Sequence, residues 1–391
     1  MLPIKPISPH YPKTSSHFSM SYLSDPRIVA TLDAGGTNLV FGAIQGGEYI
    51  KGPITLPAMA HDLDACLGQI IKGFDLLFSD PAQRPIAISF AFPGPADYPR
   101  GIIGGFLPNF PSFRDGVALG PMLEERFGVP VFINNDGDLF AYGESLCGML
   151  PEINQRLEDM GAQKRFHNLI GYTVGTGLGI GIVINGHLNR GDNSCVETFC
   201  LPHPTLSDVI IEEGASTRAV CRVYGELTGE NVAEMNARDI AEIADGNRPG
   251  NATAAQEAFA QMGRTLGVAI ATAATLIDGI VVLGGGVMAA KRWIMPSLMD
   301  ALHATIHTLK GENLPRMQMK VYDLDNPDTF SNFARGAVRR IKVYGSNRYV
   351  DYDEQKRIGI AISKLGANKA VSIGAYVFAL HELDQHTSTK N

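Results

Sequence analysis

The chain lacks the features that mark membrane proteins, secreted disulfide-rich proteins and nucleic-acid-binding proteins. No run reaches the roughly 18 uninterrupted apolar residues of a membrane span, because even the most apolar region, Val268–Val287, contains Asp278. The formal net charge of −7 argues against nucleic acid as a partner, since nucleic-acid-binding surfaces carry clustered Lys and Arg. The five cysteines are an odd number scattered through 391 residues, which predicts reduced thiols in a cytoplasmic protein rather than a disulfide framework. They are Cys66, Cys147, Cys195, Cys200 and Cys221.

The length of the chain predicts two domains, each with its own hydrophobic core. Short strand-like runs alternate with helical stretches, which is the pattern of α/β architecture. We expect an extended N-terminal arm over residues 1–26, which are rich in proline and lack the apolar core of a signal peptide. A smaller α/β domain is expected over residues 27–134, completed by residues 370–391. A larger α/β domain is expected over residues 135–369.

Local hydrophobic periodicity predicts most of the individual elements. Strands are predicted at Arg27–Asp33, Leu39–Ile44, Ile86–Phe92, Val129–Asn134 and Gly279–Leu283. Helices are predicted at His61–Phe78, Asp138–Cys147, Thr253–Ile277 and Gly374–Leu380. The polar segment Pro151–Asn168 is predicted to be a surface excursion, and the role of Arg339–Lys364 does not follow from its sequence.

Two glycine turns, each between two apolar runs, are the most informative feature of the chain. The first lies in residues 29–42, VATLDAGGTNLVFG, and the second, around Gly175-Thr176-Gly177, lies in residues 168–191. Because glycine has no Cβ atom, phosphate oxygens can approach the outward-pointing backbone N–H groups of such turns. The pair therefore predicts two turns that bind the phosphates of one ATP molecule from opposite sides. Two ordinary hairpins are the alternative. The GxxxxGK[ST] loop is absent and the GxGxxG spacing does not match, which excludes the other common nucleotide motifs.

Four polar residues are candidates for the chemistry. Asp33 ends the strand before the first turn and is expected to hold hydrated Mg²⁺, which binds few carboxylates and several waters; capping the turn is the alternative. Asp136 follows a strand and is the candidate general base that accepts the proton of an attacking alcohol. Asp138 is expected to be a first-turn helix residue, and capping is the alternative for both acids. Asn109 suits a sugar hydroxyl because its amide both donates and accepts, and an ordinary turn is the alternative.

Six motifs, in order, resemble the ROK family of sugar kinases and sugar-responsive repressors, within the superfamily of hexokinase, actin and the heat-shock chaperone ATPases. They are DAGGTN at Asp33–Asn38, PNFPSF at Pro108–Phe113, NNDGDLFAYGE at Asn134–Glu144, the segment Gly175–Gly191, LGGGV at Leu283–Val287 and SIGAYVFAL at Ser372–Leu380. The resemblance implies a two-domain actin-like ATPase (ribonuclease H-like) α/β fold with an inter-domain cleft. The implied phosphate contacts are Asp33, Gly35, Gly36, Thr37, Asn38, Gly175, Thr176 and Gly177, and the implied adenosine contacts are Gly284, Gly285 and Gly286. The implied sugar contacts are Asn109, Asn135, Asp136, Glu197 and Glu212.

The segment after the second turn departs from the family pattern. Cys200 stands at the position of the family's zinc-binding His, and the family's cysteine-rich loop is missing from Leu201–Ile211. Cys195, Cys200 and His203 supply at most three of the four ligands of a tetrahedral zinc site, so zinc is not expected. The alternative is that these three side chains lie near a pocket wall and bind no metal. Because the lost His is also a sugar contact in the family, the identity of the sugar stays open.

The predicted function is ATP-dependent phosphorylation of a hydroxyl of a hexose or related sugar, with Mg²⁺. The partners are expected to be the sugar and ATP, without nucleic acid or membrane, and the resembling family favours a homodimer. Two alternatives stay open: a non-catalytic sugar-sensing regulator without a DNA-binding domain, and an actin-like ATPase acting on a protein. The candidate base Asp136 weighs against the first. The sugar-side residues Asn109, Glu197 and Glu212 weigh against the second.

Overall fold

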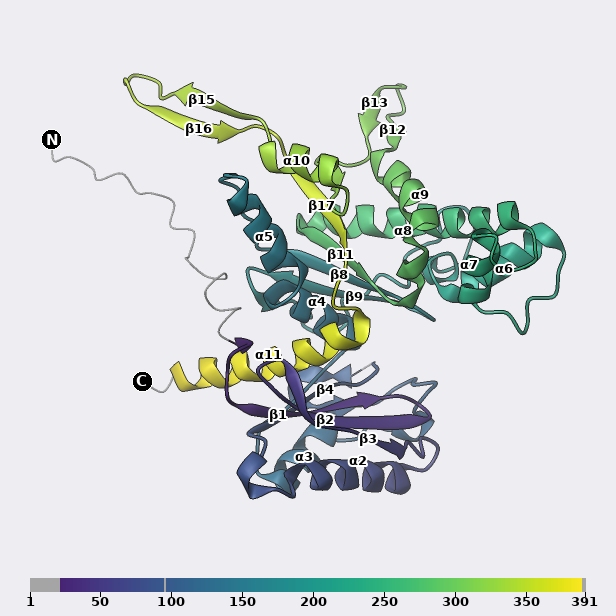
Figure 1. Ribbon diagram of the computed structural model, residues 1–391, viewed down its shortest axis with the longest axis vertical. Coiled ribbons are helices and arrows are strands. Elements are labelled where there is room, and N and C mark those ends of the chain that lie inside the picture. Colours follow the sequence, from purple (N-terminus) through teal and green to yellow (C-terminus); the bar gives the residue numbers. More distant parts are fainter. Residues whose placement is uncertain (1–21, 95, 389–391) are drawn as a thin grey trace.

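The structure, a computed structural model, describes residues 22–94 and 96–388 and consists of two α/β lobes with a long helix between them (Figure 1). Most of the predicted arm, residues 1–26, lies outside the described residues. The chain enters the N-terminal lobe first, continues into the C-terminal lobe, and returns through helix α11 (Ala367–Ser388). The predicted domain boundary at residues 134–135 falls where the last strand of the first sheet ends.

The N-terminal lobe is built on a five-stranded mixed sheet in the order β3-β2-β1-β4-β7. Its strands are β1 (Ile28–Ala34), β2 (Asn38–Gln45), β3 (Glu48–Pro57), β4 (Ala87–Ala91) and β7 (Val131–Asn134). β1, β2 and β3 pair antiparallel, whereas β1, β4 and β7 run parallel. Helices α2 (Leu63–Phe78) and α3 (Leu119–Phe127) lie on one face of the sheet and α11 on the other (Figure 1). A short hairpin, β5 (Ala96–Asp97) with β6 (Ile102–Ile103), leads toward the loop that carries Asn109.

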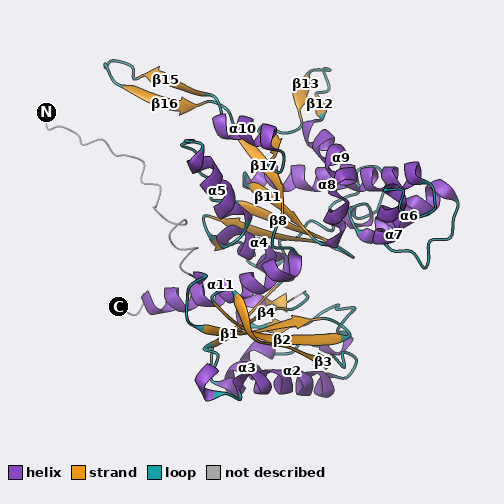
Figure 2. Ribbon diagram, viewed as in Figure 1, coloured by secondary structure: helices purple, strands orange, loops and turns teal. Residues whose placement is uncertain are grey.

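The C-terminal lobe is built on a six-stranded sheet in the order β10-β9-β8-β11-β17-β14. Its strands are β8 (Leu169–Val174), β9 (Leu178–Ile184), β10 (His187–Leu188), β11 (Ile280–Gly284), β14 (Lys320–Asp323) and β17 (Arg357–Ile362). β8, β11, β17 and β14 run parallel, so their carboxyl ends meet at one edge of the sheet. Its helices are α5 (Met149–Asp159), α6 (Thr217–Thr228), α7 (Ala237–Ala244), α8 (Ala252–Ile277), α9 (Lys291–His303) and α10 (Pro327–Arg335). Figure 2 shows α6, α7 and α8 grouped on one side of this lobe.

Helix α4 (Asp136–Leu146) joins the lobes and crosses α11 with almost no side chains between the two backbones. All of its residues after Asp136 are buried. A Cβ added to Gly374 of α11 would collide with the carbonyl oxygen of Leu139, and one added to Gly143 would collide with that of Ala370. Only glycine at these two positions permits this approach of the helices.

Two hairpins project from the C-terminal lobe (Figures 1 and 2). One pairs β12 (Thr305–His307) with β13 (Asn313–Pro315), and the other pairs β15 (Val338–Lys342) with β16 (Tyr349–Asp353). The longer one, β15–β16, begins directly after α10 and ends four residues before β17. The stretch Arg339–Lys364, whose role the sequence left open, is therefore this arm together with a central strand of the sheet.

Most of the predicted elements are confirmed, and one prediction is wrong. The hairpins β1–β2 and β8–β9, helices α2 and α8 and strand β11 form where the periodicity placed them. Pro151–Asn168 is not a polar excursion, because most of α5 falls in it. Leu150, Ile153 and Leu157 of this helix are buried in the core. Among the described residues, no helix is long and apolar enough to cross a membrane, and all five cysteines are free.

Candidate active site

The first glycine turn joins β1 to β2 and is open to solvent. Asp33, Gly35, Gly36, Thr37 and Asn38 are all exposed. The turn is closed by a hydrogen bond in which the Gly35 N–H donates to the carbonyl oxygen of Asn38 at 3.0 Å. Asn109 is also exposed and packs against the turn, since a Cβ added to Gly36 would lie 3.1 Å from both Cβ and the carbonyl oxygen of Asn109. The predicted phosphate turn and the predicted sugar loop are thus neighbours.

The second glycine turn joins β8 to β9 and is held in shape by a carboxylate. The Gly175 N–H donates to the carbonyl oxygen of Gly177 at 3.0 Å. The Glu212 carboxylate accepts from the backbone N–H of Leu178 at 2.9 Å and from the guanidinium of Arg218, also at 2.9 Å. The structure therefore places Glu212, which the family resemblance implies as a sugar contact, directly against the second phosphate turn, with both of its oxygens engaged.

Asp136 lies at the N-terminus of α4, where the helix dipole favours a negative charge. Asn135 caps the helix, its side-chain oxygen accepting from the Gly137 N–H at 2.7 Å, and one oxygen of Asp136 accepts from the same N–H at 2.9 Å. Water reaches the Asp136 carboxylate, yet protein surrounds it on most sides. This desolvation, with a smaller contribution from the charge of Asp33, raises the pKa of Asp136. The candidate base and the acid of the first turn are therefore close enough to repel each other.

Further carboxylates surround Asp136 and affect one another's protonation. Burial, followed by the charges of Asp138, Asp136 and Glu212, raises the pKa of Glu197 to about 8. Burial raises the pKa of Asp138 to about 7. Glu197 and Glu212 come from the C-terminal lobe, whereas Asp136 and Asp138 sit on the helix that joins the lobes. The arrangement gathers acids from distant parts of the sequence around one site, and it favours the protonated form of Glu197 at neutral pH.

Two residues that the sequence did not single out support this cluster. Arg190 donates to the side-chain oxygen of Asn134 at 2.7 Å, and its guanidinium carbon lies 5.5 Å from the ring centroid of Phe378 on α11. The positive charge of Arg190 also favours the ionised form of Asp138. Tyr98 is buried beside Asn135, and its hydroxyl donates to a backbone carbonyl oxygen at 2.9 Å. Tyr98 stands outside the motifs, whereas Arg190 lies within the segment Gly175–Gly191, where the glycine pattern carries no signal for its contact with Asn134.

The donors at the site suit magnesium better than zinc. Asp33 is exposed at the first turn, although neighbouring protein desolvates its carboxylate enough to raise the pKa. An accessible carboxylate of this kind fits Mg²⁺, which binds few carboxylates and several waters. Cys195 and Cys200 are exposed, and the Nδ1 of His203 accepts from the backbone N–H of Thr205 at 3.3 Å. Within residues 22–94 and 96–388, no three His, Cys, Asp or Glu side chains lie close enough to hold a metal ion.

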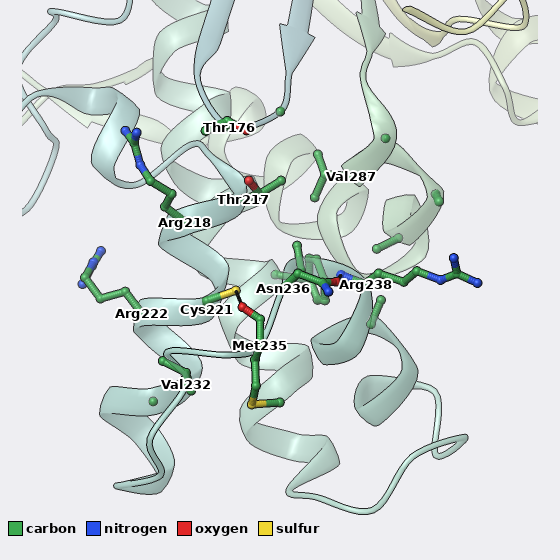
Figure 3. Close-up of a pocket in the computed structure, with 18 of the residues that line it drawn as sticks. Thr176, Thr217, Arg218, Cys221, Arg222, Val232, Met235, Asn236, Arg238 and Val287 are labelled. Atoms are coloured by element: carbon green, nitrogen blue, oxygen red, sulfur yellow. Dashed lines mark hydrogen bonds between the residues drawn. The ribbon is translucent and has the colours of Figure 1, made fainter. Parts of the chain in front are cut away.

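A cavity of about 1420 Å³ opens beside the second turn (Figure 3). Its wall includes Gly175 and Thr176 of the turn, helices α6 and α7, and the short helix Gly286–Ala290 after β11. The labelled side chains around it are Thr176, Thr217, Arg218, Cys221, Arg222, Val232, Met235, Asn236, Arg238 and Val287. The cavity adjoins the predicted phosphate turn and has room for a nucleoside, since small-molecule sites measure roughly 300–1,000 Å³.

The three glycines after β11 differ in their positions relative to this cavity. Gly286 is exposed and lines it. Gly284 lies against the Phe140 ring. Gly285 has φ +106° and packs on the Val174 carbonyl, where a Cβ would overlap the oxygen. Of the three predicted adenosine contacts, Gly286 faces the open space, Gly284 lets β11 pack closely on Phe140 of α4, and Gly285 lets the chain after β11 pack on the end of β8.

Comparisons with known proteins agree with the motifs. A model of the ROK family matches residues 29–321. Curated relatives include the xylose repressor of Bacillus subtilis, 37% identical over 150 residues, covering 36% of this chain and 34% of the repressor. They also include the glucokinase of Thermotoga maritima, 29% identical over 160 residues, covering 41% of this chain and 45% of the glucokinase. The matches to these two relatives thus span less than half of their length.

Solved structures resemble the chain over nearly its whole length. A glucokinase from Parabacteroides distasonis is 53% identical with a TM-score of 0.86, covering 93% of this chain and 99% of that one. A ROK hexokinase from Thermus thermophilus is 21% identical with a TM-score of 0.61, covering 91% and 99%. The predicted actin-like ATPase fold is confirmed by these similarities. Together with the family match, they show that the chain belongs to the ROK family.

Proposed function

We propose that this protein is an ATP-dependent kinase that phosphorylates a hydroxyl group of a hexose or a related sugar. The observation that carries the proposal is the position of Asp136, whose accessible carboxylate lies within electrostatic range of Asp33 on the first glycine turn. An acid at the N-terminus of α4, beside a phosphate turn, is placed to act on an alcohol next to a triphosphate. The 53% identity to a glucokinase supports the same activity.

In the proposed reaction, the Asp136 carboxylate accepts the proton of the sugar hydroxyl while the hydroxyl oxygen attacks the γ-phosphorus. The bond from the γ-phosphorus to the β,γ-bridging oxygen breaks, and ADP leaves. Backbone N–H groups of the two glycine turns bind the phosphate oxygens. Asp33 would hold Mg²⁺ through water, and the ion would neutralise charge on the transferred phosphoryl group.

The sugar side of the site is assigned to Asn109, Asn135 and Glu197. Asn109 contacts the first turn and is open to solvent, so its amide is available to both a donor and an acceptor of a sugar ring. A protonated Glu197 donates a hydrogen bond as well as accepting one, because its pKa is raised to about 8. Glu212 is assigned an indirect role, in which it holds the second turn.

The experiment that tests the assignment replaces Asp136 with Asn. Loss of a positioned general base lowers the turnover rate by about 10²–10⁴-fold, measured by coupling ADP formation to a second enzyme over a panel of free sugars. Asp75→Asn is the matched control, because Asp75 lies on the surface of α2 and pairs with Arg126 at 3.1 Å. Binding of a non-hydrolysable ATP analogue reports whether the fold is kept. Near-native turnover in Asp136→Asn would refute the assignment of the base.

A sugar-responsive regulator is the second candidate function. The 37% identity to a xylose repressor over 150 residues favours it. The sugar panel separates the two candidates, because turnover stimulated by one sugar supports the kinase, whereas sugar binding without turnover supports the regulator. A turnover rate that no sugar changes contradicts the kinase and leaves the remaining alternative, an ATPase acting on a protein.

A further inference from the structure

A second cavity, of about 1030 Å³, lies at the end of the C-terminal sheet opposite the second glycine turn. It is formed by the loop over residues 160–167 before β8, the end of α10, the base of the β15–β16 arm, and Arg357, the first residue of β17. Because β8 and β17 belong to one parallel set, their first residues lie at one edge and the turn at Gly175 lies at the other. In Figure 1, α5, α10 and the foot of the arm surround this region.

Cations outnumber acids in the wall of this cavity. The lining contains Lys164, Arg165, Arg335 and Arg357 against Asp351 and Asp353. Arg165 pairs with Glu158 at 3.5 Å. Lys164 and Arg335 form no ion pair with any residue that the structure describes. A local excess of positive charge is unusual in a chain whose formal net charge is −7.

Arg357 is the buried member of this group, with a side chain only 2% exposed. Its guanidinium pairs with Asp353 and donates to the carbonyl oxygen of Gln355 at 3.2 Å, but its Nε has no hydrogen-bond partner. Burial, followed by the charge of Arg357, lowers the pKa of Lys164, and the charge of Asp353 offsets part of this. Two cations thus oppose each other in a partly desolvated place, an arrangement that an anion between them would stabilise.

Packing explains only part of this arrangement. The Arg357 guanidinium carbon lies 5.7 Å from the centroid of the Phe333 ring and contacts Gly336, so the residue also fastens the foot of the arm to α10. That contact leaves its Nε unpartnered and involves neither Arg335 nor Lys164, whose ammonium lies 5.0 Å from the centroid of the Phe166 ring and has no carboxylate partner among the described residues. An anion bound between Lys164 and Arg335, beside Arg357, would neutralise the excess positive charge that these contacts leave.

We propose that this cavity binds a small phosphate-bearing anion, either inorganic phosphate or a phosphomonoester such as a hexose phosphate. Guanidinium and ammonium groups form charge-assisted hydrogen bonds to phosphate oxygens. The two charges of a phosphate dianion match the two cations that lack a carboxylate partner. The cavity is much larger than inorganic phosphate requires, so it also has room for the carbon skeleton of a phosphomonoester. Binding here is independent of the proposed kinase activity.

The full chain is titrated calorimetrically with inorganic phosphate and, separately, with glucose 6-phosphate at low ionic strength. The cavity variant is Lys164→Gln/Arg335→Gln, which leaves the buried Arg357 and therefore the fold in place. The control variant, Lys342→Gln/Arg348→Gln, removes the same charge from the far half of the arm. Circular dichroism verifies that both variants are folded.

We expect the wild-type protein and the control variant to bind one more equivalent of phosphate than the cavity variant, or to bind it at least tenfold more tightly. Phosphate bound at the proposed kinase site beside Asp136 contributes equally to all three proteins, because neither variant alters that site. Added salt should weaken the difference, since it screens the cavity charges. Tighter binding of glucose 6-phosphate would identify a phosphomonoester site, and equal binding an oxyanion site. Identical titrations of the cavity and control variants, or no binding by the wild type, would overturn the proposal.

Discussion

Replacing Gly137 with Ala tests the contact that positions the candidate base. Gly137 is the second residue of α4, and an added Cβ would lie 2.5 Å from the carbonyl oxygen of Ile180 and 2.9 Å from its backbone nitrogen. These are backbone atoms of strand β9, which is paired on both sides, so no side-chain rotamer can relieve the contact. Restoring an ordinary separation moves the start of α4 by roughly 1 Å, and overpacking of this kind costs about 1–3 kcal/mol of stability.

The helix propensity of Ala offsets part of that loss. Gly-to-Ala substitution within a helix contributes about 1 kcal/mol, so the net loss for Gly137→Ala is expected to be roughly 1–2 kcal/mol. Gly68→Ala is the matched control, because Gly68 lies on the exposed side of α2 and an added Cβ meets no atom within 4 Å. This variant is expected to gain up to about 1 kcal/mol. Urea denaturation followed by circular dichroism measures both changes, which have opposite signs.

The same displacement should slow the proposed reaction. Asp136 is the residue before Gly137, and misplacing a catalytic group by about 1 Å costs on the order of 10²-fold in rate. The coupled assay with the preferred sugar is expected to show this loss in Gly137→Ala and native turnover in Gly68→Ala. If the two variants were equally stabilised and equally active, the close approach of α4 to β9 would be wrong, and so would its role in holding Asp136.

Three further changes are predicted from the acids around the site. Burial raises the pKa of Glu197 to about 8, so the folded protein keeps this proton up to about pH 8 whereas the unfolded chain has already lost it. The free energy of unfolding should therefore fall from pH 5.5 to pH 8 by about 2 kcal/mol more in the wild type than in Glu197→Gln. The same pH-dependent change in the unfolding free energy of both proteins, measured with urea, would contradict this. Glu212→Gln should raise the KM for ATP several-fold, because the second turn loses the carboxylate that binds the Leu178 N–H. Glu213→Gln, which loses only a contact to Arg218, should leave this KM unchanged. Equal KM values in the two variants would show that Glu212 does not hold the turn. Asp33→Asn should raise the Mg²⁺ concentration for half-maximal turnover about tenfold, and an unchanged magnesium titration would remove Asp33 from the metal's surroundings.

Local patterns predicted the elements that carry the turns. The apolar runs on both sides of Gly35–Thr37 and Gly175–Gly177 form antiparallel strand pairs as expected, because alternation and glycine turns are short-range signals. Helix α5 was missed because Ile153 and Leu157, the two of its four buried residues that fall within Pro151–Asn168, are separated by polar and charged residues, so the segment is polar on average. Its helical period, rather than its mean polarity, was the signal that the sequence carried.

The surroundings of the candidate base were less predictable, because they are made by contacts between distant parts of the chain. Arg190 reaches Asn134 across 56 positions, and Asp138, on the helix that follows β7, raises the pKa of Glu197. The nucleoside-sized cavity is walled by α6 and α7, whose sequences contain no motif. The positions of Gly284 and Gly285 depend on how β11 packs against Phe140 and the end of β8, which no local pattern specifies.

The bare crossing of α4 and α11 has a mechanical consequence. Where helices interlock through large side chains, rotation requires the ridges of one to climb out of the grooves of the other. At Gly143 and Gly374 the backbones touch without such ridges, and the nearest large side-chain contact is the edge-on packing of Tyr142 on Phe378, one turn further along α11. Because Asp136 begins α4, this crossing lies on the same rigid rod as the carboxylate. A change in the angle between the lobes would then move the Asp136 carboxylate by rotation about the helix contact at Gly143, which lies two turns along α4.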